Sequence, residues 1–155
     1  FCCLTGLAYV DVASLSTENI VEGKRGKQWL RKARNKTNNM CNIPLLRSAL
    51  RILEKYAEFR AATGRLLPVP SNQKMNAYLK ELATLCGITK NLTTHCARHT
   101  FATTVTLANG ASLENVSKML GHSSVRMTQH YAKILNSSIE RDMDKIESEL
   151  IGEDE

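Results

Sequence analysis

Three short segments of the chain carry side chains that could act together on a phosphate group. His95 and Arg98 are three residues apart, Gly121 precedes His122, and Tyr131 lies nine residues after His122. A planar guanidinium suits two-pronged contact with an oxyanion, histidine exchanges protons near neutral pH, and a tyrosine hydroxyl can act as a nucleophile. These residue types therefore favour chemistry on a phosphodiester.

The amino-acid sequence that flanks these residues is more specific than the residues alone. Residues 92–104 read LTTHCARHTFATT and residues 119–133 read MLGHSSVRMTQHYAK. The order H-x-x-R, then L-G-H, then a tyrosine on a short helix resembles the catalytic domain of the tyrosine recombinase, or phage integrase, family. Residues 36–45, KTNNMCNIPL, look like the hairpin that bears the family's catalytic lysine. Residues 5–15, TGLAYVDVASL, resemble its helix start T-G-L-R-x-x-E-L, so the resemblance covers nearly the whole chain.

The resemblance implies a role for each matching residue. Tyr131 would attack the phosphodiester and form a 3′-phosphotyrosyl link, while Arg98 clamps the phosphate. His95 would take the tyrosine proton, His122 would donate to a nonbridging oxygen, and Lys36 would protonate the leaving 5′ oxygen. Because the link to tyrosine keeps the bond energy, neither a metal nor another cofactor is required. The alternative for each residue is an ordinary structural role in the core, in a helix cap or on the surface.

The family pattern breaks at its first arginine, where this chain has Ala8. Losing one such donor commonly slows an enzyme by a factor of about a hundred, so an active protein needs a replacement. Residues two apart on a strand face the same way, and Arg34 is two before Lys36, whereas Arg31 would face the opposite side. We therefore predict that Arg34 substitutes for the missing arginine; the alternative is that it contacts DNA backbone or solvent.

Two further histidines lie beside the predicted site. His95 and His99 have the spacing of a zinc-binding helix, but the HExxH motif places glutamate where this chain has Cys96. We interpret His99 as a hydrogen-bonded structural residue and His130 as a surface neighbour of the nucleophile. The sequence thus predicts no metal site.

Hydrophobic spacing and turn residues predict the elements that must hold these side chains. In a last helix from Ser137, Ile139, Met143, Ile146 and Leu150 form one apolar stripe. We expect other helices over 5–15, 45–61, 71–87, 94–109, 112–120 and 128–133, and short strands over 20–21, 28–34 and 40–44. The pattern predicts an α+β fold, mostly α-helical, with a small antiparallel three-stranded sheet.

Charge is unevenly distributed along the chain. The net charge is +6, and because residues 137–155 hold eight acidic and two basic side chains, residues 1–136 carry +12. A body this basic favours a polyanion such as double-stranded DNA, although a merely soluble basic surface is the alternative. We expect Lys74, Lys90 and Thr94 to contact the DNA.

The 155 residues, 43% of them hydrophobic, suffice for one globular domain. Five cysteines without a C-x-x-C pair, and the lack of a long apolar run, predict a cytoplasmic protein with reduced thiols and no membrane partner. Because the chain starts inside an apolar segment without Met, we expect a catalytic domain over 1–155, truncated at its N-terminal side. It would divide into a catalytic body, 1–136, and a C-terminal helix with an acidic tail, 137–155. The N-terminal domain with which the family clamps DNA would be absent.

Two functions of different classes follow. The resemblance implies a site-specific DNA recombinase or integrase of a mobile genetic element, working with other protomers as a tetramer on DNA and with accessory DNA-bending proteins. The alternative is a catalytically impaired DNA-binding relic or regulator, because of Ala8. Five retained site residues favour the first.

The family also exchanges a C-terminal segment between protomers, so the apolar stripe would pack either on a neighbour or on its own domain.

Overall fold

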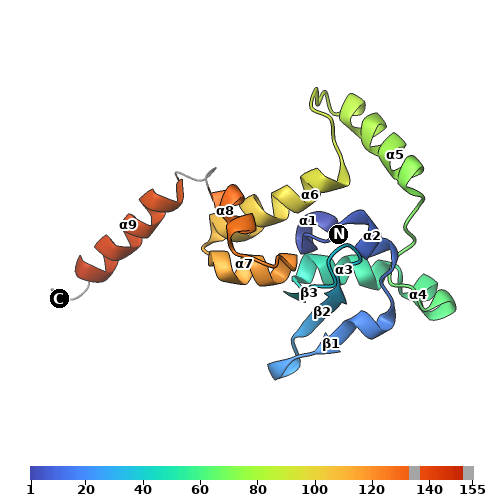
Figure 1. Cartoon of the computed structure of the whole chain (residues 1–155), viewed down its shortest axis with the longest axis horizontal. Coiled ribbons are helices and arrows are strands. Elements are labelled where there is room, and N and C mark those ends of the chain that lie inside the picture. Colours follow the sequence, from blue (N-terminus) through green and yellow to red (C-terminus); the bar gives the residue numbers. More distant parts are fainter. Residues whose placement is uncertain (133–136, 152–155) are drawn as a thin grey trace.

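The structure is a computed structural model that describes the backbone of residues 1–132 and 137–151 (Figure 1). Its strands are β1 (Ile20–Glu22), β2 (Gln28–Ala33) and β3 (Met40–Pro44). Its α-helices are α1 (Cys2–Thr5), α2 (Tyr9–Ala13), α3 (Arg47–Lys55), α4 (Ala57–Thr63), α5 (Asn72–Leu85), α6 (Thr94–Thr100), α7 (Leu113–Leu120), α8 (Arg126–Ala132) and α9 (Ser137–Ile151). The shorter turns of helix are η1 (Thr17–Asn19), η2 (Lys24–Gly26), η3 (Phe101–Thr106) and η4 (Leu107–Asn109). The predicted fold class, α+β and mostly helical, is confirmed.

The sheet is antiparallel throughout, in the order β1-β2-β3. Leu30 of β2 lies opposite Ile43 of β3, and both side chains are buried, whereas the next residue, Arg31, is exposed. Such alternation is typical of a sheet with one face on the core. The hairpin between β2 and β3 carries Lys36 in its turn.

Two predicted helices are each broken in the structure. The helix expected over 5–15 is wrong as one element, because Gly6 adopts a left-handed backbone (φ 66°) that ends α1 before α2 begins. The helix expected over 45–61 breaks at Tyr56 (φ −108°, ψ 26°) into α3 and α4. There the Arg60 guanidinium donates to the Leu53 carbonyl, 2.9 Å away, which satisfies an acceptor that the break would leave unpaired.

The other helices match their predicted ranges closely, and Lys133, the predicted end of the helix over 128–133, lies outside the described residues. Ser71 caps α5 and Ser112 caps α7, each through a hydroxyl that accepts a backbone N–H of the first turn. The segment 94–109 is helical throughout, but its middle third, η3, is a π-helical turn. Thr106 stabilises that turn by donating its hydroxyl to the carbonyls of Phe101 and Ala102.

The core lies where α1, the sheet, η3 and α7 meet, and α5 and α9 extend away from it (Figure 1). The predicted apolar stripe on α9 is exposed, with exposed fractions of 48–66% for Ile139, Met143, Ile146 and Leu150. The stripe is therefore not buried on its own domain. Within residues 1–132 and 137–151, no helix combines the length and apolarity that crossing a membrane needs.

Candidate active site

Arg98 is the centre of the predicted site and is almost fully buried, with 4% of its surface exposed. Its two terminal nitrogens each donate a 2.6 Å hydrogen bond to a backbone carbonyl, one to Gly6 and the other to Leu120. These acceptors come from the turn after α1 and from the end of α7. The guanidinium thus joins three segments that are far apart in the sequence, and its orientation is fixed by the backbone.

Two glycines allow this close approach. Gly6 has φ +66°, and a Cβ there would lie 2.8 Å from the Leu120 side chain. Gly121 has φ +61°, and a Cβ there would lie 2.8 Å from Cys41 Sγ and 2.9 Å from Arg34 Cδ. Both positions need a left-handed backbone and have no room for a side chain, which only glycine satisfies. The two carbonyls that hold Arg98 are therefore at, or next to, obligatory glycines.

Arg34 lies close enough to Arg98 for their charges to interact. We call the cluster of Arg98, Arg34, His122 and Tyr131 the arginine pocket. Its aliphatic carbons pack against Gly121, and its Nε is 3.8 Å from the Asp11 carboxylate. Burial lowers the pKa of Arg98, and the positive charge of Arg34 lowers it further, while Tyr131 acts in the opposite direction. Two guanidinium groups close enough to repel each other create a positive pocket that an oxyanion would stabilise.

His122 also faces this pocket. Its Nδ1 is 2.9 Å from the hydroxyl of Thr128, which is fully buried. Burial lowers the pKa of His122 to about 4, and the charges of Arg98 and Arg34 act in the same direction. The imidazole is therefore neutral near pH 7. The tautomer with its proton on Nε2 is the one in which the Thr128 hydroxyl donates to Nδ1.

Tyr131, on α8, is buried among histidine rings, with 6% of its surface exposed. Its ring is parallel to that of His122 within 7°, with centroids 6.3 Å apart. The ring of His99 meets it edge-on at 4.9 Å, and that of the exposed His130 at 6.1 Å. The tyrosine is thus fixed between α6 and the turn after α7.

His95 is placed differently from the other predicted site residues. It is exposed, and its ring contacts that of His99 edge-on at 4.7 Å. Burial lowers the pKa of His99, with His95 and His130 adding to the effect. The structure therefore brings His99, which we interpreted as a structural residue, against the tyrosine ring, with His95 one ring further out.

The remaining predicted residues lie outside the pocket. Lys36 is exposed in the turn between β2 and β3. Lys74 is exposed in the first turn of α5, Lys90 is exposed in the loop before α6, and Thr94 is half-buried at the start of α6. Over the described part of the chain, no group of three or more acidic, histidine or cysteine side chains could hold a metal ion.

Sequence reasoning missed two polar side chains behind the pocket. Thr128 precedes Tyr131 by three residues on α8, so helical spacing alone places it on the same face. Asp11 occupies the acidic position of the segment T-G-L-R-x-x-E-L, but nothing in the sequence indicated that its partner would be Arg34. Both side chains are buried, and each contacts a predicted site residue.

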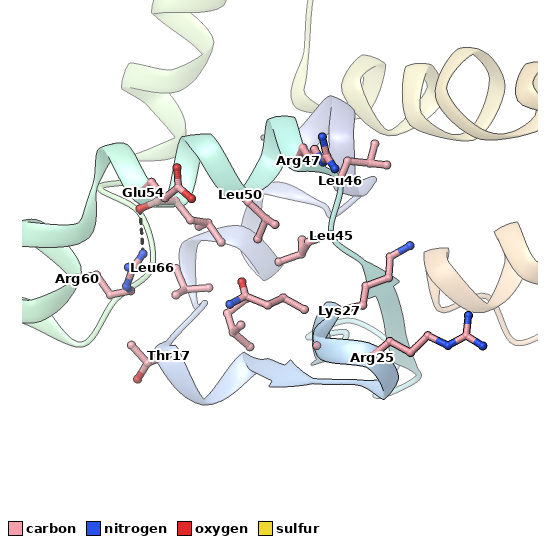
Figure 2. Close-up of a pocket in the computed structure, with 14 residues that line it drawn as sticks. Thr17, Arg25, Lys27, Leu45, Leu46, Arg47, Leu50, Glu54, Arg60 and Leu66 are labelled. Atoms are coloured by element: carbon pink, nitrogen blue, oxygen red, sulfur yellow. Dashed lines mark hydrogen bonds between the residues drawn. The ribbon is translucent and has the colours of Figure 1, made fainter.

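A separate open groove of about 940 Å³ lies between the turn after β1 and helix α3 (Figure 2). Its floor includes Leu45, Leu50 and Leu66, and Arg25 and Lys27 lie on its rim. It contains none of the predicted site residues. The groove and the arginine pocket are therefore different features of the molecule.

Solved structures establish the fold. A crystal structure of XerA recombinase is similar with a TM-score of 0.71 and 24% sequence identity, covering 94% of this chain and 55% of that chain. A lambda integrase dimer bound to a COC′ core site has a TM-score of 0.61 and 21% identity, covering 84% of this chain and 48% of that chain. The fold is that of an integrase catalytic domain.

The model of the phage integrase family matches residues 1–137, and the chain belongs to that family. Tyrosine recombinase XerD of Rhizobium meliloti (strain 1021) is 32% identical over 146 residues, covering 87% of this chain and 45% of the relative. Tyrosine recombinase XerC of Pelobacter propionicus is 29% identical over 143 residues, covering 84% of this chain and 42% of the relative. The chain thus spans less than half the length of these relatives.

Proposed function

We propose that this chain breaks and rejoins DNA strands in site-specific recombination, through a 3′-phosphotyrosyl intermediate at Tyr131. One observation carries the proposal: a buried guanidinium, fixed by two backbone carbonyls, lies close to both Tyr131 and His122. A phosphodiester undergoing attack needs positive donors on its nonbridging oxygens and a nucleophile in line with the leaving oxygen. The pocket offers both kinds of group.

In the proposed reaction, the Tyr131 hydroxyl oxygen attacks phosphorus and the bond from phosphorus to the 5′ oxygen breaks. Arg98 and the Nε2 proton of His122 stabilise the nonbridging oxygens. His95 accepts the tyrosine proton through the ring of His99, which lies between them. Lys36 gives a proton to the leaving 5′ oxygen. Rejoining is the same reaction in reverse with another 5′ hydroxyl, so no external energy source or metal takes part.

Arg34 supplies the second positive donor in this proposal. Its charge acts on both Arg98 and His122, which supports this role. Double-stranded DNA is the proposed substrate, bound through the basic body of residues 1–136, with Lys74, Lys90 and Thr94 as contacts. Other protomers, as a tetramer on DNA, and accessory DNA-bending proteins are the proposed partners. The division into body and C-terminal tail remains a prediction.

Ala8 favours a second candidate function, a DNA-binding relic or regulator without cleavage. The two candidates differ in one product, a covalent link between protein and DNA. The full natural protein would be incubated with duplexes that carry a nick and a randomised central region. Cleavage near the nick releases a short 5′ fragment, and its loss prevents rejoining and traps the intermediate. Adducts that survive denaturation would be isolated and their DNA sequenced.

The recombinase proposal predicts adducts enriched in one DNA sequence, and none with Tyr131→Phe, which removes only the attacking oxygen. DNA binding should be nearly unchanged in that variant. Binding without any adduct in the wild-type protein would support the relic. An adduct at wild-type yield in Tyr131→Phe would exclude Tyr131 as the nucleophile.

A further inference from the structure

Asp11 is a fully buried carboxylate behind the arginine pocket, with 1% of its surface exposed. It lies on α2, three residues after Ala8. Its Oδ1 accepts a 2.8 Å hydrogen bond from the backbone N–H of Asn35, and its Oδ2 is 3.8 Å from Arg34 Nε. One carboxylate thus contacts both the side chain of Arg34 and the backbone of the next residue.

The beginning of the hairpin turn is attached to α2 by further bonds. The Asn35 side-chain amide donates to the Val10 carbonyl at 3.0 Å and to the Ser14 hydroxyl at 3.4 Å. At the other end of the turn, the Asn39 side-chain amide donates to the Gly121 carbonyl at 3.4 Å. The turn that carries Lys36 is therefore held on α2 at one end and beside the pocket at the other.

Arg34 depends on this carboxylate electrostatically. Its Nε is buried and, in the part of the chain that the structure describes, has no hydrogen-bond partner. A buried cation needs an opposite charge, and the charge of Arg98 nearby is repulsive. Without the charge of Asp11, the Arg34 guanidinium would be more stable turned away from Arg98 and into solvent.

We propose that Asp11 is a positioning residue that directs Arg34 into the arginine pocket and fixes the start of the turn presenting Lys36. In this arrangement, the helix that follows Ala8 contributes the carboxylate that orients Arg34, an arginine directly after β2. The inference rests on the proposed function for the identity of the bound anion, a DNA phosphate. Its first test measures anion binding and not DNA cleavage, so this inference and the proposed function can fail separately.

The test measures binding of inorganic vanadate, a small oxyanion, to the protein by NMR titration. Simple electrostatics predicts that Asp11→Asn, which removes a negative charge near the pocket, binds the anion more tightly. Our proposal predicts the opposite, a loss of about tenfold, because one charge-assisted donor is no longer aimed at the anion. Glu18→Gln, which removes an exposed acidic charge from η1, is the control and should leave the affinity unchanged.

The second arm asks whether Asp11 acts through Arg34. In an Arg34→Ala background, Asp11→Asn should cause no further loss of vanadate affinity, because the residue it positions is gone. Hydrogen exchange of the Asn35 amide should stay slow in Asp11→Asn, whose side-chain oxygen still accepts that bond, and become fast in Asp11→Ala. Equal or tighter vanadate binding by Asp11→Asn, an additive loss in the double variant, or slow exchange in a folded Asp11→Ala would overturn the proposal.

Discussion

Arg98 is oriented before any DNA arrives, because its two terminal nitrogens are already bonded to the carbonyls of Gly6 and Leu120. Such preorganisation is what makes oxyanion donors effective, since no reorganisation is needed during the reaction. A lysine has a single nitrogen and cannot bond both carbonyls while also facing a phosphate. We predict that Arg98→Lys lowers the rate of DNA cleavage by a factor of about a hundred or more.

Arg98→Lys should also reduce the free energy of unfolding by about 1 to 3 kcal/mol, because one buried carbonyl loses its donor. Single-turnover cleavage and urea denaturation measure the two effects. Wild-type cleavage by this variant would remove Arg98 from the site.

Arg34 should act as a second donor to the oxyanion. Arg34→Ala should slow cleavage by a factor of about a hundred with DNA binding little changed, the loss expected for one oxyanion donor. Cleavage rates at saturating protein, together with binding curves, separate the two effects. Arg31→Ala, which alters an exposed arginine of β2, the strand just before Arg34, is the matched control. Normal cleavage by Arg34→Ala would show that Arg34 is not the replacement for the missing arginine.

His122 should make stability depend on pH. Its pKa falls from 6.5 in the unfolded chain to about 4 in the folded protein, so the folded state resists protonation. This contribution to stability is complete above pH 6.5 and is lost as the pH falls through 6.5 toward 4. His122→Asn should flatten that loss by about 1 to 3 kcal/mol, measured by denaturation at several pH values. Parallel profiles of stability against pH for the wild type and His122→Asn would contradict this role of His122.

The sequence predicted which residues gather at the site better than it predicted their partners. Tyr131, Arg98 and His122 could be named because their order along the chain matched a known pattern. Thr128 and Asp11 could not, since a buried hydrogen bond depends on how elements pack and leaves no periodic signal. The position of His99 against the tyrosine ring, in place of His95, likewise depends on the exact rotation of α6.

At the scale of elements, Gly6 both ends α1 and presents its carbonyl to Arg98. The sequence predicted one helix here because its apolar residues keep helical spacing, and spacing does not report a left-handed residue. Gly6→Ala should destabilise the protein by about 3 kcal/mol, since a left-handed alanine and clashes with Phe101 and Leu120 add together. Gly64→Ala is the matched control, because Gly64 has a similar φ of +70° with no atom within 4 Å of the new Cβ.

Gly64→Ala should therefore cost only about 1 kcal/mol, the backbone strain alone. Thermal unfolding of both variants measures the difference. Equal melting temperatures would mean that the close approach of the turn after α1 to Leu120 is not rigid.

The molecule as a whole combines a basic body with an acidic C-terminal segment, +12 over residues 1–136 against a net +6. Binding to double-stranded DNA should therefore weaken steeply with salt, because lysines and arginines release cations from the phosphates. We expect a loss of about a hundredfold in affinity between about 50 and 200 mM salt. A flat response in a titration over this range would contradict DNA as the substrate.

The exposed stripe of α9 offers a contact to a second protomer, since an apolar helix face is rarely left in water. Removing residues 137–155 should leave DNA binding intact but impair recombination if the segment is exchanged between protomers. The fold and the stripe could both be predicted from hydrophobic spacing. The partner of the stripe could not, because spacing identifies an apolar face but not what covers it.

The central claim is that Tyr131 becomes covalently bound to DNA, and mass spectrometry of the trapped adduct tests it most directly. Nuclease treatment would reduce the DNA to a short 3′-linked nucleotide, and trypsin would release the peptide 127–133, which contains Tyr131 as its only tyrosine. The account predicts that this peptide gains the mass of the nucleotide through the tyrosine oxygen. A nucleotide mapped to any other residue, or a peptide left unmodified while adduct forms, would contradict it.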